Sequence, residues 1–267
     1  MQVEMPIFKL RQGNSALLVS MPHVGTYLPQ WLLPRLTAEA QTVADTDWHL
    51  DQLYDFLDEL DATVLVATHS RYVIDLNRPT DNTSLYPGQN TTGLCPVDNF
   101  EENPIYLPNQ EPAAEEIQSR IEQYWRPYHD ALASELNRLK AIHGRAMLWD
   151  AHSIQSVVPR FFNGELPHLN IGSADNQSCP ASITEDIAQV AAASPYSSVV
   201  NGRFKGGYIT RHYGKPAEDV YAVQLEIAMR SYMHESAPYL LNQELASKLR
   251  PTLRSMMLAM LAWSSSE

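Results

Sequence analysis

The chain has 267 residues, of which 44% are hydrophobic, and a formal net charge of −12. A chain of this length and composition can bury a sizeable core. It could form one large domain or two small ones, since length alone does not determine the number of domains. The balance of 19 Lys and Arg against 31 Asp and Glu argues against sequence-independent nucleic-acid binding, which needs cations to neutralise phosphates, but it allows a small anionic substrate held by a few arginines.

Cysteine usage and hydropathy favour a cytoplasmic protein. The two cysteines, Cys95 and Cys179, form no C-x-x-C pair, so neither a cysteine zinc motif nor a disulfide framework is predicted. Residues 1–13 lack the pattern of a signal peptide, and no uninterrupted apolar run reaches the ~18 residues of a membrane span. We therefore expect a cytoplasmic chain with no membrane partner.

Polar groups follow the first predicted strand and open the first predicted helix. The apolar run at residues 15–21 predicts a strand that leaves His23 at its end. Asp45 and Asp47 precede apolar residues spaced by three and four, which predicts a helix over residues 45–60. Acids in a first helical turn suit the helix dipole, and this is their structural explanation.

A second strand, predicted at residues 63–68, leads into a segment that contains Arg71, Asn77 and Arg78. The following residues, 79–110, show little periodicity and predict a long ordered loop. Loops of this length in compact domains are usually functional or disordered.

The middle of the chain predicts a helix and then a buried strand. Apolar residues recur on one face over residues 111–143, although Pro127 should kink this helix. The apolar run that begins at Ala146 stops at Asp150-Ala151-His152, which predicts a buried strand with acid/base or metal-binding groups at its end.

The last third of the chain predicts a loop, a helix and a hairpin. Residues 154–180 predict the loop, and the capping-box spacing of Ser182 and Glu185 predicts a helix to about residue 193. Residues 199–213 predict a strand or hairpin centred on Gly206-Gly207. Two further elements complete the chain: a strand at 220–227 that contains Glu226, and a helix at 240–263 interrupted at Pro251.

Strands that alternate with helices predict an α/β fold, a mainly parallel sheet with helices on both faces. No linker divides the chain, so we expect a single catalytic domain over residues 1–267. Ligands of such sheets bind at the carboxyl ends of the strands. The polar groups that end the four apolar runs are His23, His69-Ser70-Arg71, Asp150-Ala151-His152 and Glu226.

These groups suit metal-assisted amide hydrolysis. Two imidazoles and a carboxylate, with a fourth position left to water, are the usual ligands of a catalytic zinc ion. Glu226 would take the proton of the water and pass it to the leaving amine, while Arg71 and Arg78, with Asn77, would bind a substrate carboxylate. Each residue also has a structural reading, such as packing or ion pairing, and the local zinc motifs H-E-x-x-H and H-x-x-E-H are absent.

Six motifs resemble those of the N-formylglutamate amidohydrolase (deformylase) family, in the same order and over about residues 5–260. Each is short, but the ordered set is specific. The motifs are Met21–Gly25, Asp45–Asp51, Ser70–Pro79, Asp150–Ser153, Gly206–Gly214 and Gln224–Glu226.

The resemblance implies hydrolysis of N-formyl-L-glutamate to formate and L-glutamate, the closing step of one route of histidine degradation. It implies a zinc-carboxypeptidase-like fold with a mixed, mostly parallel sheet. Carried over by position, His23, Asp47 and His152 look like the ligands of one Zn²⁺ ion per chain, and Glu226 looks like the general base. Asn77-Arg78 resembles a pair that binds an α-carboxylate, and Asp150 is expected to fix His152 without binding the metal.

One departure leaves the carboxylate ligand open. Zinc carboxypeptidases place the acidic ligand three residues after the first histidine, where this chain has Thr26. Asp47 fits best, but Asp45 and Asp51 remain alternatives, because Asp47 and Asp51 would share one face of a helix.

A substrate with two carboxylates suggests a second cationic cluster. Arg211 and His212, after the Gly206-Gly207 turn, are the candidates. The alternatives are a deacylase for another N-acyl amino acid or small amide, and a non-catalytic binding protein for acidic amino acids; the latter is disfavoured by the presence of all the candidate catalytic residues. A homo-oligomer is possible, and the sequence does not decide this.

Overall fold

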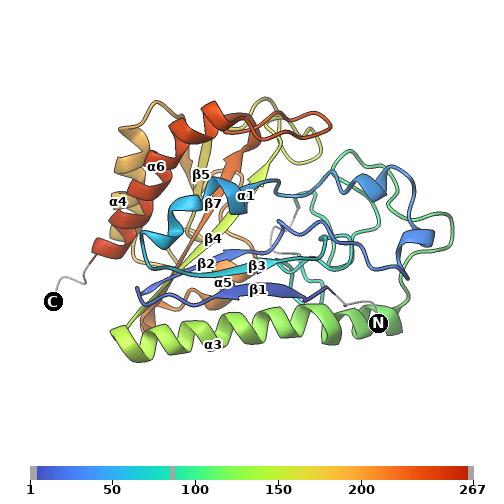
Figure 1. Cartoon of the computed structure of the whole chain (residues 1–267), viewed down its shortest axis with the longest axis horizontal. Coiled ribbons are helices and arrows are strands. Elements are labelled where there is room, and N and C mark those ends of the chain that lie inside the picture. The colour runs from blue at the N-terminus through green and yellow to red at the C-terminus, as the bar shows by residue number, and fades with distance from the viewer. Residues whose placement is uncertain (1–4, 85–87, 264–267) are drawn as a thin grey trace.

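A mixed β-sheet forms the centre of the molecule (Figure 1), whose computed structural model describes residues 5–84 and 88–263. Within these residues seven strands form one sheet in the order β1-β3-β2-β4-β7-β5-β6. The strands are β1 (Phe8–Arg11), β2 (Leu17–Met21), β3 (Thr63–Ala67), β4 (Ala146–Ile154), β5 (Leu169–Gly172), β6 (Ser198–Val200) and β7 (Val220–Ala228).

The strand directions confirm the mixed, mostly parallel sheet. The pairs β2–β3, β2–β4, β4–β7 and β5–β6 are parallel, whereas β1–β3 and β5–β7 are antiparallel. The sequence interpretation missed β1 and β5. Each has only four residues, too few for a clear alternation, and β5 lies in the segment predicted as a loop over residues 154–180.

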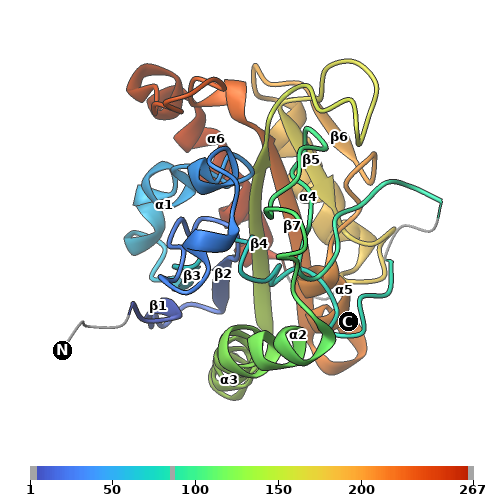
Figure 2. The ribbon, with the colours of Figure 1, turned by 90° about the vertical axis from the view of Figure 1, so that its right-hand side faces the viewer.

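Helices cover both faces of the sheet, as predicted (Figures 1 and 2). The α-helices are α1 (Leu50–Leu53), α2 (Ala114–Arg120), α3 (Arg126–His143), α4 (Ala181–Ala192), α5 (Tyr208–Tyr213) and α6 (Gln243–Ala262). A π-helical turn, η4 (Ile121–Trp125), joins α2 to α3. The 3-10 turns are η1 (Leu33–Arg35), η2 (Ala40–Thr42), η3 (Asp55–Asp58), η5 (Pro216–Glu218) and η6 (Met229–Ser231). Among the described residues, no helix has the length and apolarity needed to cross a membrane.

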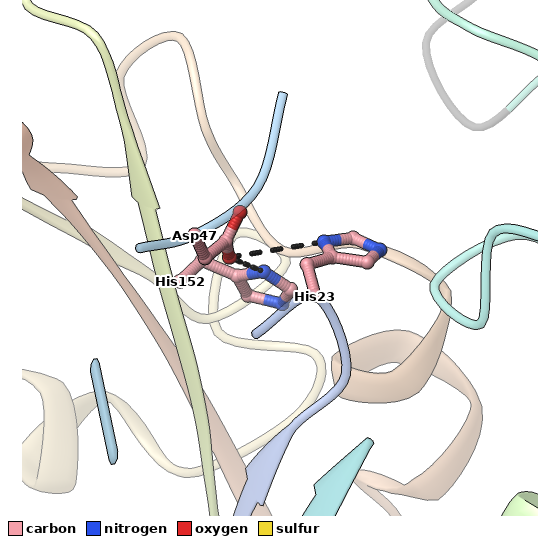
Figure 3. Close-up of side chains that lie close together, drawn as sticks. All are labelled: His23, Asp47 and His152. Atoms are coloured by element: carbon pink, nitrogen blue, oxygen red, sulfur yellow. Dashed lines mark hydrogen bonds and ion pairs between the residues drawn. The ribbon is translucent and has the colours of Figure 1, made fainter. Parts of the chain in front are cut away.

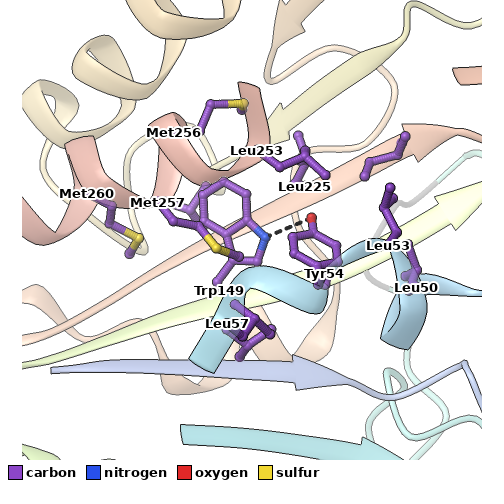
Figure 4. Packing of buried hydrophobic residues seen from close by; sticks show 14 of the residues in the cluster. Leu50, Leu53, Tyr54, Leu57, Trp149, Leu225, Leu253, Met256, Met257 and Met260 are labelled. Atoms are coloured by element: carbon purple, nitrogen blue, oxygen red, sulfur yellow. Dashed lines mark hydrogen bonds between the residues drawn. The ribbon is translucent and has the colours of Figure 1, made fainter. Parts of the chain in front are cut away.

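The first face of the sheet packs against α1, α4 and α6. Trp149 on β4 is fully buried there, and its indole nitrogen donates to the Tyr54 hydroxyl at 3.2 Å (Figure 4). Helix α6 continues through Pro251, so the predicted interruption is wrong. A proline inside a helix costs about 3 kcal/mol. The burial of apolar side chains on both sides of it, among them Leu249 and Leu253, offsets this cost.

The opposite face changes from apolar to polar halfway along β4 and β7. Side chains of a strand alternate between faces, so Leu148 and His152 point to the same side of β4. Leu148 packs in the core beneath α3. His152, further along the same face of β4, lies beside its partner Glu226 on β7. Helix α3 therefore covers the amino-terminal half of this face, and the carboxyl-terminal half carries the polar groups.

Two predicted elements have different structures. The helix predicted over residues 45–60 starts only at Leu50, because His49 adopts a left-handed conformation with φ of 60°. The hairpin predicted over residues 199–213 is instead β6 followed, after a loop, by α5. Gly206, with φ of 114°, turns the chain there, and the helix begins directly after Gly207.

Other predicted helices and loops agree with the structure, with local changes. The helix predicted over residues 111–143 is divided by η4, whose wider turn accommodates Pro127. The helix predicted from Ser182 is α4, but no side chain caps it; the Ser182 hydroxyl instead accepts a hydrogen bond from Trp263. The described part of the predicted loop 79–110 contains no helix or strand, and its residues 85–87 lie outside the described residues.

Candidate active site

Three side chains from separate segments converge at the carboxyl end of the sheet (Figure 3). His23 follows β2, Asp47 lies in the turn before α1, and His152 lies on β4. Oδ2 of Asp47 is 3.0 Å from Nδ1 of His152 and 3.8 Å from Nδ1 of His23. All three side chains are buried. The Asp47 amide donates to the His23 carbonyl at 3.0 Å, which fixes the turn against the strand end.

The alternatives to Asp47 lie elsewhere. Asp45 is buried, but its carboxylate accepts the amide of Phe100 at 3.0 Å. Asp51 is exposed and accepts the amide of Gln52. Because the helix starts after Asp47, the helical relation between positions 47 and 51 that left the choice open does not exist.

A second carboxylate faces the outer nitrogen of each imidazole. Nε2 of His23 is 2.7 Å from Oδ1 of Asp75, and Nε2 of His152 is 3.2 Å from Oδ1 of Asp150. Asp150 also accepts a hydrogen bond from the Thr210 hydroxyl at 3.0 Å. A carboxylate on the outer nitrogen orients a histidine that binds a metal through its other nitrogen. Asp75 occupies this position at His23. At His152 the hydrogen-bond partner of Nε2 is the side-chain nitrogen of Asn77 at 3.0 Å, and the expected role of Asp150 as the residue that fixes this ring stays a prediction.

Burial and charge set the protonation of the two imidazoles. Burial, reinforced by the Arg71 charge, lowers the pKa of His23. Burial also opposes protonation of His152, but the carboxylates of Asp150 and Asp47 outweigh it and raise the pKa of His152. An excess of buried carboxylates surrounds the imidazoles, with Arg71 as the buried guanidinium beside them. The donor set and this negative charge fit a divalent metal ion held by His23, Asp47 and His152.

Glu226 lies beside His152, its direct partner on the neighbouring strand. Burial raises the pKa of the Glu226 carboxyl to about 8. Gln224 orients this group: its Nε2 donates to Oε2 of Glu226 at 3.2 Å, and its Oε1 accepts the amide of Gly207 at 2.7 Å. Gln224 was not predicted as a site residue, although it points to the same side of β7 as Glu226.

The three converging residues and Glu226 line a partly open cavity. Its wall includes three phenylalanines, Phe100, Phe161 and Phe204, and three arginines, Arg71, Arg78 and Arg203.

Arg71, Asn77 and Arg78 line this cavity. Arg71 forms a buried ion pair with Asp75 at 2.6 Å. The side-chain nitrogen Nδ2 of Asn77 lies 3.0 Å from Nε2 of His152, and Arg78 donates to the Thr92 carbonyl at 2.8 Å. Their predicted contacts with a substrate carboxylate stay predictions, but their positions permit these contacts.

The structure does not bring Arg211 and His212 to the cavity. Arg211 donates to the Gly206 carbonyl at 2.8 Å, and the exposed His212 ring stacks on Tyr208. The prediction placed these residues after a hairpin turn, whereas the segment forms α5 and directs them elsewhere. Arg203, which the sequence interpretation missed, lies at the cavity instead. No periodicity marks its loop, so the sequence offered no signal for it.

Comparisons with known proteins show the family of the chain. Residues 15–233 match a family model described as N-formylglutamate amidohydrolase. The chain is 46% identical over 260 residues to an N-formylglutamate deformylase of Pseudomonas putida, covering 97% of each chain. It is 47% identical over 258 residues to that of Pseudomonas aeruginosa, covering 96% of this chain and 97% of the relative. The crystal structure of an N-formylglutamate amidohydrolase from Ralstonia eutropha has a TM-score of 0.81 at 25% identity, covering 96% of this chain and 97% of that one.

Proposed function

Because the chain belongs to the N-formylglutamate amidohydrolase family, we propose that it hydrolyses N-formyl-L-glutamate to formate and L-glutamate. The observation that carries this proposal is the buried group of His23, Asp47 and His152 directly beside Glu226, in a cavity that also presents guanidinium groups.

A zinc ion suits the donor set of two imidazoles and one carboxylate. When bound, it would act as a Lewis acid toward the formyl carbonyl and acidify a water molecule. Asp75 and Asp150 hold the imidazoles so that both Nδ1 atoms face Asp47. Such outer contacts fix ring orientation and increase ligand basicity.

Glu226 acts as the proton carrier in this scheme. Its carboxylate takes a proton from the attacking water as the water oxygen bonds to the formyl carbon. It then returns the proton to the amide nitrogen as the C–N bond breaks, which yields formate and the free amino group of glutamate. A pKa raised to about 8 by burial suits a group that must both accept and donate near neutral pH. Bound cations nearby would shift this balance toward the carboxylate.

Arg71 and Arg78 supply positive charge for the substrate. Arg71 acts electrostatically on both His23 and Glu226, so it is placed to stabilise negative charge on the formyl oxygen or to attract a carboxylate. Arg78, at the side of Asn77, is placed to bind the α-carboxylate. The predicted small anionic substrate is consistent with this arrangement.

A role in histidine degradation, a cytoplasmic location and the alternative of another N-acyl amino acid as substrate belong to this proposal. The two cysteines are unpaired, which suits a reducing compartment. The core motifs define the type of reaction more closely than they define which substrate side chain is accepted. Another N-acyl amino acid therefore stays the alternative substrate. A non-catalytic binding protein would have no need of Glu226 beside the histidines.

Formate release tests the proposal. Purified protein is stripped with a chelator, reloaded with Zn²⁺, and assayed for formate with N-formyl-L-glutamate and for acetate with N-acetyl-L-glutamate. We expect formate production that the chelator abolishes and zinc restores. Preferential release of acetate would favour the acyl-amino-acid alternative, and ligand binding without turnover would favour the binding protein.

A further inference from the structure

We propose that Arg203 forms a second carboxylate-binding subsite, which recognises the side-chain carboxylate of the substrate and so selects acidic amino acids. This inference rests on the proposed function for the reaction, and it adds the residue that determines the side-chain specificity. It also replaces Arg211 and His212, the cluster predicted from sequence for that task.

Arg203 is held at the wall of the cavity by contacts with two neighbouring loops. Its Nε donates to the Phe161 carbonyl at 2.6 Å, and its Nη2 donates to the Asn90 carbonyl at 3.2 Å. The guanidinium carbon lies 5.3 Å from the centre of the Phe204 ring and 5.8 Å from that of Phe161. Both rings line the same cavity, so the guanidinium has a fixed orientation at an aromatic wall.

The three arginines of the cavity have different surroundings. Arg71 is buried in its ion pair with Asp75, and Arg78 is tied to Thr92 beside Asn77. Arg71 is bonded to Asp75, which contacts His23, and Arg78 follows Asn77, which contacts His152. Arg203 is instead bonded to the loops at Phe161 and Asn90. We therefore place Arg203 in a part of the cavity away from the reacting groups, where the far end of a bound amino acid would lie.

The chemistry of this wall suits a carboxylate at the end of an aliphatic side chain. The aromatic rings provide apolar surface for methylene groups beside the guanidinium. A charge-assisted hydrogen bond gains strength in such surroundings. A neutral side chain of the same shape would offer the guanidinium no charge-assisted hydrogen bond, so we expect it to bind less strongly than a carboxylate.

The test compares Arg203→Met with Arg211→Met, a matched control outside the cavity. For each protein kcat/KM is measured with N-formyl-L-glutamate and with N-formyl-L-glutamine, its neutral isostere. Charge-assisted hydrogen bonds contribute ~1.5–3 kcal/mol, so Arg203→Met should lower kcat/KM for formylglutamate ~10–150-fold. Its kcat/KM for formylglutamine should change less than about threefold, and Arg211→Met should preserve the preference of the wild type.

Binding of the products L-glutamate and L-glutamine, followed by calorimetry, gives a readout independent of turnover. Arg203→Met should weaken the binding of L-glutamate and leave that of L-glutamine unchanged. Arg203→Lys keeps a positive charge and should keep part of the preference for L-glutamate, so it is the test variant if Arg203→Met folds poorly. Equal losses for both substrates and both products would assign Arg203 a structural role and overturn the proposal, as would no loss at all. If the wild type releases no formate, the proposed function fails, and product binding still decides whether Arg203 recognises the carboxylate.

Discussion

Gly207→Ala should reduce catalysis more than stability. A Cβ atom at Gly207 would lie 2.3 Å from the side-chain nitrogen Nδ2 of Asn77, a separation that real Cβ atoms do not show. Its φ of −83° is open to alanine, so the effect comes from this contact and not from backbone strain. Asn77 must move by about 1 Å to restore normal contact, or Gly207 must withdraw and weaken its hydrogen bond to Gln224.

Either movement disturbs the site. Overpacking costs about 1–3 kcal/mol, which lowers Tm by about 2–10 °C in a chain of this size. A displacement of ~1 Å at a positioning group reduces catalysis ~10²-fold. We therefore expect kcat/KM for formylglutamate to fall ~10²-fold while Tm, measured by differential scanning fluorimetry, stays within that range.

Gly144→Ala is the control for this prediction. Gly144 ends α3 with φ of 73°, and nothing lies within 4 Å of an added Cβ. Alanine there should lower Tm through backbone strain of ~1–2 kcal/mol and leave kcat/KM unchanged. If Gly207→Ala retains kcat/KM within about threefold of the wild type, the coupling of Gly207 to the site through Asn77 and Gln224 is wrong.

Three further predictions concern the metal, the base and pH. Glu226→Gln should keep its zinc, measured by atomic absorption, and lose ~10²–10⁴-fold in kcat; a surviving kcat would exclude it as the base. His152→Ala should lose the metal, whereas His69→Ala, also at a strand end but outside the ligand group, should retain it; full zinc in His152→Ala would refute the ligand assignment. Burial lowers the pKa of His129 to about 3, below the ~6.5 of an unfolded chain. As the pH falls below ~6.5 the unfolded state binds a proton that the folded state does not, so the free energy of unfolding decreases. From about pH 7.5 to about pH 5, urea unfolding should show the wild type losing about 2 kcal/mol more than His129→Phe; parallel losses would contradict this.

Strand-end residues were the predictable part of the site. Asp150, His152 and Glu226 end long apolar runs, and β4 and β7 are buried along their whole length. The alternation of side chains makes the polar positions of one strand meet those of its neighbour, as in the pairing of His152 with Glu226. The sequence therefore predicted that these groups lie at strand ends on one edge of the sheet, whereas the adjacency of His152 and Glu226 follows from the pairing of β4 with β7, an order of strands that the sequence left open.

Residues outside the strands could not be placed in this way. Asp47 reaches the site because His49 turns the chain and because the Asp47 amide binds a carbonyl at a distant strand end. Arg203 reaches the cavity through carbonyls of Phe161 and Asn90, 42 and 113 residues away. Such contacts depend on loop conformations that no local periodicity encodes. The resemblance to a family gave Asp47 its role, but it gave no role to Arg203.

The π-helical turn before α3 connects the packing of the core to the site. Pro127 predicts a kink, and the structure accommodates it in η4 (Ile121–Trp125). Trp125, the last residue of this turn, donates to the Arg78 carbonyl, and Nε2 of His129 in α3 donates to the Leu76 carbonyl, both at 2.9 Å. These two carbonyls flank Asn77, so one helix face fixes the backbone on both sides of a residue in the cavity. The hydrogen bond to Leu76 requires a proton on Nε2 of His129, which the neutral ring can carry. Helix α3 therefore covers the apolar half of this sheet face and also holds the backbone beside Asn77 at the polar half.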